Sequence, residues 1–154
     1  MVAWADPPPF VSRDNNFKAV FPAPVKVAHP RSEQITYGCA PSDKRRDWEA
    51  ISVLKGDLRK PPLAALNYLV SEGVIKAHPG KIKNILLDKL PGIEVSGLDE
   101  KGYPFGLRIF TTTEATYVLM SCNMDLARTQ AFLKSFELTT PAPKVTPPKR
   151  KKQK

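Results

Sequence analysis

Residues that commonly carry chemistry are scarce in this sequence, which has two cysteines, two histidines and two tryptophans among 154 residues. A zinc site needs three or four well-placed ligands, and His29 and His78, each followed by proline, predict none. The sequence also lacks a Gly-x-Ser-x-Gly elbow, a Walker A loop and a dinucleotide-binding glycine motif. These absences predict a protein that is not an enzyme, has no catalytic residues and needs no metal or other cofactor.

Long hydrophobic runs are absent too. The longest apolar segments, such as residues 115–122, have the length of a strand and fall well short of the roughly 20 residues that cross a bilayer. We therefore expect no membrane span. A hydrophobic content of 42% and a charged content of 25% are typical of a globular chain, and the length suits one domain. We expect that domain to be a monomer.

Acidic residues are outnumbered, 15 against 24 basic ones, which gives a net charge of +9. The excess lies at the C-terminal end, which has no acidic residue and six basic ones: Lys144, Lys149, Arg150, Lys151, Lys152 and Lys154. Residues 1–143 carry a net charge of only +3. Prolines cluster at both ends, and proline favours extended, solvated chain. We therefore expect a flexible arm at 1–14, a globular domain at 15–139 and a disordered Pro/Lys-rich tail at 140–154.

The first residues have the small side chains that signal peptidase reads. Ala3 and Ala5 stand before Asp6 in an Ala-x-Ala pattern, although the charged and apolar regions that should precede it are missing. We interpret the segment as the remnant of a signal peptide, with the mature chain beginning at Asp6. A chance Ala-x-Ala is the alternative. The first interpretation predicts a periplasmic or secreted protein, and the alternative leaves a cytoplasmic one.

The two cysteines, Cys39 and Cys122, both fall in segments that alternate as strands do. Two buried free thiols are one interpretation, because cysteine packs as a small hydrophobic side chain. A single disulfide is the other, because an oxidising compartment permits it. Such a bridge would restrict the unfolded chain, and in the loop-entropy model this raises the free energy of unfolding by about 4–5 kcal/mol. The residues alone leave both interpretations open, and an even number of cysteines agrees with export.

Apolar periodicity predicts an α+β order of elements with an antiparallel sheet. Alternation of apolar and polar residues favours strands, whereas apolar spacings of three and four favour helices. The first helix is expected to begin at Pro61-Pro62 and end at Pro79-Gly80, and Asp125 is expected to cap the second. Three strands precede the first helix and four follow it: residues 17–21, 33–40, 48–54, 81–88, 93–98, 105–112 and 115–122.

Four segments of the sequence carry a resemblance to a known family. They are "FKAVFPAPVKV", "LPGIE", "GLRIFTTTEATYVLMSCN" and "FLKSFEL", which together extend over about residues 16–138. In these segments the chain resembles the bacterial relatives of PsbP, the extrinsic subunit of photosystem II. The resemblance implies an α/β/α sandwich, with a central antiparallel sheet of about six or seven strands flanked by two helices. It also implies a non-enzymatic, often exported domain, and it carries over no catalytic residue.

Two functions follow from these observations. The first is an exported PsbP-like accessory module that binds an unidentified protein or ligand through its sheet or loops. The alternative is a cytoplasmic protein that binds nucleic acid or another polyanion through its basic tail, at Lys149, Arg150, Lys151, Lys152 and Lys154. About six basic residues give salt-sensitive binding without sequence preference. A further alternative is that the tail only aids solubility and binds no polyanion. We expect the first function, without nucleic acid as a partner.

Overall fold

The computed structural model describes residues 8–39, 48–72, 78–98, 103–122 and 125–139. Its main feature is a seven-stranded sheet with the order β3-β4-β5-β9-β8-β7-β6, in which every neighbouring pair is antiparallel. The strands of this sheet are β3 (Lys26–Arg31), β4 (Gln34–Cys39), β5 (Trp48–Leu54), β6 (His78–Leu87), β7 (Leu90–Leu98), β8 (Pro104–Thr111) and β9 (Thr116–Cys122).

A second, smaller sheet has the order β1-β2-β10. Its strands are β1 (Phe10–Ser12), β2 (Phe17–Ala19) and β10 (Glu137–Leu138). The helices are α1 (Pro62–Ser71) and α2 (Leu126–Ser135), and a short 3-10 helix occupies Gly56–Leu58. Asp125 caps α2 as expected, because its Oδ1 accepts a hydrogen bond from the backbone N–H of Ala127 (2.9 Å). Within the described residues, neither helix has the length and apolar character needed to cross a membrane.

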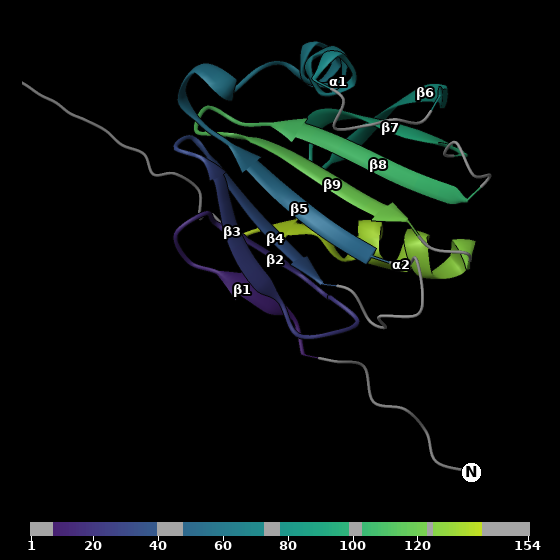
Figure 1. Cartoon of the computed structure of the whole chain (residues 1–154), viewed down its shortest axis with the longest axis horizontal. Coiled ribbons are helices and arrows are strands. Elements are labelled where there is room, and N and C mark those ends of the chain that lie inside the picture. Colours follow the sequence, from purple (N-terminus) through teal and green to yellow (C-terminus); the bar gives the residue numbers. More distant parts are fainter. Residues whose placement is uncertain (1–7, 40–47, 73–77, 99–102, 123–124, 140–154) are drawn as a thin grey trace, which may run out of the picture.

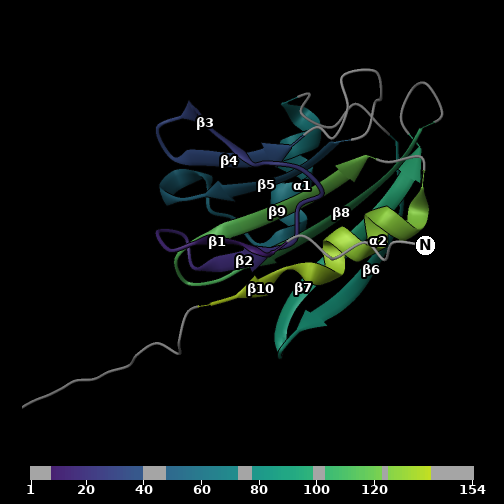
Figure 2. The ribbon, with the colours of Figure 1, turned by 90° about the horizontal axis from the view of Figure 1, so that it is seen from below.

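The elements form three layers (Figures 1 and 2). Helix α1 lies on one face of the seven-stranded sheet, and α2 lies with the small sheet on the other face. The alternation of side chains in β9 serves both layers, since Tyr117 and Leu119 pack with α2 whereas Val118 packs with α1. The α+β fold expected from the sequence, an antiparallel sheet with two flanking helices, is confirmed. The small sheet beside α2 is an addition to it.

Gly106 in β8 allows α2 to lie close to the large sheet. A Cβ atom built at this position would lie 2.7 Å from Cγ2 of Thr129 and 3.0 Å from Cδ1 of Leu133. Contacts this short do not occur between well-packed atoms, so any larger residue would push the helix outward. The backbone of β8 therefore sets the distance at which Phe132, Leu133 and Phe136 of α2 enter the core.

The first helix is shorter than its periodicity predicts. It ends at Ser71 with Glu72 as its C-cap, and the Pro79-Gly80 pair that was expected to end it belongs to β6. In the sequence Gly73 follows the C-cap, which is the position where glycine most often stops a helix. The remainder of the expected helix, residues 73–77, lies outside the described part of the chain.

Residues 1–14, expected to form a flexible arm, contain strand β1. This strand pairs antiparallel with β2, with Phe10 opposite Ala19. Its anchor is Phe10, whose ring contacts the rings of Phe17, Phe21 and Tyr37. Apolar contact thus outweighs the preceding prolines, and the folded domain begins before residue 15.

Several residues named from the sequence lie outside the described part of the chain. The interpretation of residues 1–7 as a signal-peptide remnant and of residues 140–154 as a disordered tail therefore stays a prediction. The residues concerned are the expected cleavage site, Ala3, Ala5 and Asp6, and the basic side chains Lys149, Arg150, Lys151, Lys152 and Lys154.

We expect Phe10→Ala to lower the free energy of unfolding by about 2–4 kcal/mol, because it removes a ring packed against three others. The matched control is Val11→Ala on the same strand, whose side chain is half exposed and whose truncation should cost under about 0.5 kcal/mol. Urea unfolding of the full chain measures both. Equal effects of the two substitutions would show that β1 does not pack on the core.

Candidate functional site

Two cavities flank Phe10, which lines both of them. The first has a volume of about 460 Å³, and its walls come from β1, the loop after β1, β3 and β4; they include Val11, Arg13, Asn15, Val27, Ile35 and Tyr37. The second has a volume of about 490 Å³ and is lined by Pro8, Pro9 and residues 21–25. Both volumes fall within the range typical of small-molecule sites, roughly 300–1,000 Å³.

A polar cluster made of Ser12, Asn15 and Tyr37 forms one wall of the first cavity. Oγ of Ser12 lies 3.0 Å from Oη of Tyr37, and Nδ2 of Asn15 donates a hydrogen bond to the same tyrosine oxygen (2.5 Å). The backbone N–H of Asn15 donates to Oγ of Ser12 (3.2 Å). Oη of Tyr117 donates to the backbone carbonyl of Asn15 (2.7 Å). These bonds attach the loop after β1 to the large sheet.

The polar cluster contains an unsatisfied acceptor. Asn15 is 2% exposed, and among the described residues no group donates a hydrogen bond to its Oδ1. A buried polar atom without a partner costs roughly 1–3 kcal/mol, so such atoms in folded proteins call for an explanation. A ligand or water molecule with an N–H or O–H group would supply the donor. Asn15 lines the first cavity, so this atom is the candidate polar recognition point of the site.

Strand β3 forms the outer wall of the first cavity. All six of its residues are exposed, and its pairing with β4 changes register between Ala28 and Arg31. Pro30 lies in this irregular stretch and has no N–H to donate. His29 belongs to this strand, is exposed and lines the cavity. Within the described part of the chain, no three potential metal ligands gather at one place.

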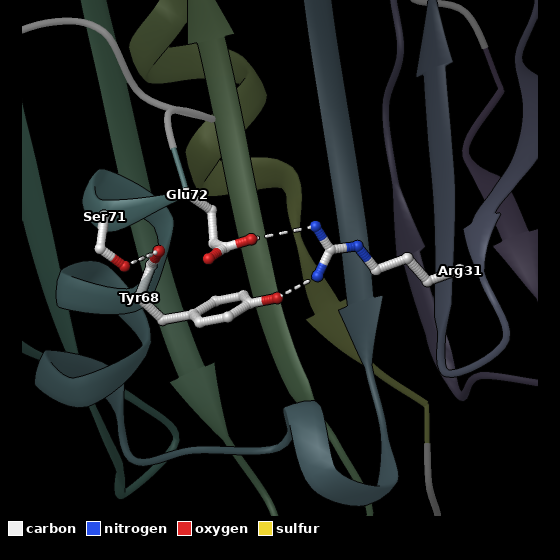
Figure 3. A network of polar contacts seen from close by, with 4 residues as sticks. All are labelled: Arg31, Tyr68, Ser71 and Glu72. Carbon is white, nitrogen blue, oxygen red and sulfur yellow. Dashed lines mark hydrogen bonds and ion pairs between the residues drawn. The ribbon is translucent and has the colours of Figure 1, made fainter.

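Arg31 ties one end of β3 to helix α1 (Figure 3). Its guanidinium donates a hydrogen bond to Oη of Tyr68 and forms an ion pair with Glu72 (3.2 Å between Nη2 and Oε1). The hydrogen bond that Arg31 donates to Glu72 is the main reason that the pKa of Arg31 is raised. Lys60 lies over the same tyrosine ring, 5.5 Å from its centroid. Exposed pairs of this kind add little to the free energy of unfolding. Their effect here is local: they hold the end of β3, and with it the outer wall of the first cavity, against α1.

Of the two interpretations left open for Cys39 and Cys122, the structure has the one without a disulfide, because the two sulfurs are not bonded to each other. Cys39 lies on β4 opposite Glu49, whereas Cys122 lies on β9 opposite Trp48. Strand β5 separates them, which places their backbones about 9–10 Å apart, beyond the 4.4–6.8 Å that a disulfide spans. They also face opposite layers: Cys39 packs on the α2 side, and Cys122 shares the face of Val118 on the α1 side.

Cys39 lies in a second buried polar cluster, beneath α2. Its thiol donates to Oε1 of Glu49 (3.7 Å), and Oγ of Ser121 lies 3.3 Å both from Oε2 of Glu49 and from Oγ1 of Thr129. Burial, followed by the charge of Glu49, raises the pKa of Cys39 to about 11. The thiol is therefore protonated near neutral pH, when it is a weak nucleophile. This arrangement joins α2 to the sheet and gives no ready catalytic cysteine.

Sequence reasoning missed the cavities. Of the residues that line them, it considered His29 as a possible ligand, and only for a metal site. The alternation of Phe10, Val11 and Ser12, followed by two asparagines before Phe17, was a usable hairpin signal. Three prolines directly upstream outweighed it in our interpretation. The residues that the sequence did single out, Cys39 and Cys122, line neither cavity.

Comparisons with known proteins establish the fold and nothing further. No family model and no curated protein matches this chain. A solved structure from Bacteroides thetaiotaomicron is similar to it, with a TM-score of 0.52 and 13% sequence identity. The match covers 92% of this chain and 52% of the other, so this chain spans about half the length of that neighbour. Identity this low supports a shared α+β architecture alone.

We expect both cysteines to react with a maleimide in denaturant without prior reduction, and the intact mass to equal that of the fully reduced chain. In the folded protein, labelling of Cys39 should be slow at pH 7 and accelerate as the pH approaches 11, because the thiolate is the reactive form. Mass spectrometry of labelled peptides measures both. A mass two units lower, with no labelling in denaturant, would restore the disulfide.

Proposed function

We propose that this chain is a non-enzymatic, PsbP-like binding module that takes a small apolar ligand in the cavities beside Phe10. The observation that carries the proposal is the pair of cavities itself, the second with apolar walls and the first with apolar and polar walls and the unsatisfied Oδ1 of Asn15 in the polar cluster. Ligand sites typically combine apolar walls with a few placed polar groups. A matching ligand has an apolar body and one hydrogen-bond donor.

The PsbP-like part of the proposal draws its support from where the resembling segments lie. "FKA" forms β2, "LPGIE" begins β7, and "GLRIFT" and "TYVLMSC" form most of β8 and β9. "FLKSFEL" closes α2 and forms β10. The segments in β7, β8, β9 and α2 thus lie in the large sheet and a flanking helix, as the resemblance implies, whereas β2 and β10 belong to the small sheet, which it does not imply. They are core and turn positions, so they bear on fold more than on activity.

The non-enzymatic part of the proposal draws its support from the buried thiol. Cys39 is the described cysteine with a raised pKa, and its neighbours Glu49, Ser121 and Thr129 are engaged with it or with one another. The first cavity is lined by apolar side chains, by the hydrogen-bonded hydroxyls of Ser12 and Tyr37, and by Arg13, Asp14 and His29 at its polar part. Binding, without bond rearrangement, is the activity that such walls serve best.

We expect indole to bind in the first cavity, and 1-methylindole, which lacks the N–H donor, to bind several-fold more weakly, because it leaves Oδ1 of Asn15 unpaired. Changes in amide chemical shift on titration measure both affinities. Val27→Trp should abolish binding by filling the cavity, whereas Val70→Trp, at an exposed valine on α1, should not. Equal binding by both variants, or shifts elsewhere in the sheet, would contradict the proposed site.

Export to the periplasm or beyond remains part of this proposal, with a cytoplasmic polyanion-binding protein as the alternative. Fractionation of cells that express the full-length gene product should find it outside the cytoplasm.

If the tail binds polyanions instead, deleting residues 144–154 should abolish duplex DNA binding. For the intact chain, the logarithm of the DNA-binding constant should fall with the logarithm of the salt concentration with a slope no steeper than about −5. Cytoplasmic protein with tail-dependent DNA binding would favour the alternative.

A further inference from the structure

β6 is the outermost strand of the seven-stranded sheet, and within the described chain no strand pairs with its outer side. From Ile82 to Leu87 it pairs with β7 without interruption. The hairpin closes through Asp88 and Lys89, both with positive φ (49° and 77°), as in the tight turns that suit twisted strands. A regular edge of this kind presents a row of backbone N–H and C=O groups to a further strand.

The two edges of the large sheet differ in how they are protected. β3 contains Pro30 and an irregular register, and both features hinder the addition of a strand. β6 also contains a proline, Pro79, and a register shift between Pro79 and Ile82, but its six residues from Ile82 to Leu87 have neither. In β3 the regular pairing is limited to Lys26, Val27 and Ala28. Lysines often protect edges, but Nζ of Lys83 is drawn back to Oε2 of Glu94 in β7 (3.5 Å). β6 is therefore the open edge.

Apolar side chains are exposed next to this edge on the α1 face of the sheet. Ile82 is 48% exposed and Leu86 is 72% exposed. Leu63 and Val70 of α1 are exposed as well and, being seven residues apart, lie on the same side of the helix. That side is turned away from Tyr68, which faces β3. These four exposed apolar side chains all lie on the α1 face of the sheet, on the side away from β3.

We propose that β6 pairs antiparallel with β6 of a second copy of this chain, with Asn84 on the twofold axis. In this register Ile82 lies opposite Leu86 of the second copy, and Lys83 lies opposite its Ile85. The two Asn84 amides face each other, and an amide both donates and accepts hydrogen bonds. The segment is therefore complementary to itself, as a twofold interface requires.

Neighbouring registers are less favourable. Centring the pairing on Lys83 places two ammonium groups directly opposite each other, which destabilises an antiparallel pair. Centring it on Ile85 places Ile82 opposite Asp88, which belongs to the turn and has left the strand conformation. A register shifted by half a residue sets side chains of opposite faces against each other, which the pleat forbids. Asn84 is thus the centre that the sequence of β6 selects.

Pairing in this register joins the two large sheets into one and brings Ile82 and Leu86 of both copies together. The interface lies at the opposite edge of the sheet from β3 and the cavities, so the inference does not rest on the proposed function. It proposes a dimer in place of the monomer expected from the sequence.

Cross-linking tests the register directly. Directly opposite residues of an antiparallel pair have Cα atoms about 4.5–5.5 Å apart, within reach of a disulfide. Asn84→Cys should therefore give a covalent dimer on mild oxidation with oxidised glutathione, visible on non-reducing electrophoresis. Lys83→Cys and Ile85→Cys, one residue to each side, should not, and the unsubstituted chain controls for the buried Cys39 and Cys122. Stronger cross-linking at either neighbour, or none at Asn84, would overturn the register.

Sedimentation equilibrium of the full chain tests the interface without cross-linking. We expect a concentration-dependent dimer, and we expect Leu86→Lys to raise its dissociation constant at least tenfold. The matched control is Leu126→Lys, which places a lysine at another exposed leucine, on α2, and should leave the constant unchanged. Circular dichroism confirms that both variants are folded. A monomer at all concentrations, or equal effects of the two substitutions, would overturn the proposal.

Discussion

The contact of Phe17 with the aromatic rings around it holds the two sheets of this protein together. Phe17 is fully buried, and its ring meets those of Phe10, Tyr37, Tyr117 and Phe136. Since β2 is the central strand of the small sheet, fixing Phe17 also fixes β1 on one side and β10 on the other. The first cavity lies where β1 meets β3 and β4, and the second lies between residues 8–10 and residues 21–25. Phe10, which packs on Phe17, lines both, so the shape of the cavities depends on this contact.

Much of the fold was predictable because the core strands obey the period-two rule. Residues 48–54 and 105–122 alternate between the two faces as their sequence indicates, and Asp125 caps α2 where a capping residue is expected. The errors arose where local signals competed. A helical apolar spacing continued beyond Glu72, although the helix stops there, and prolines beside Phe10 suggested a flexible arm where a strand forms.

The candidate site could not be predicted because its walls come from segments that only the tertiary structure brings together. Asn15, Val27 and Ile35 belong to a loop and two strands, and nothing in their local sequence shows that they share a cavity. The cysteines illustrate the same limit. Alternation shows which face of its own strand each cysteine occupies. Whether the two can form a disulfide depends on the order of the strands, and β5 lies between β4 and β9.

The central position of β9 has a consequence for biosynthesis. β9 is the middle strand of the large sheet, yet it is the last of the seven to leave the ribosome. Until residues 116–122 emerge, β3–β5 and β6–β8 form two separate meanders, each with an apolar edge that has no partner. A nascent or truncated chain that ends before Thr116 therefore exposes both edges at once. Such a chain is a natural substrate for chaperones and proteases, and only translation of β9 closes the two halves into one sheet.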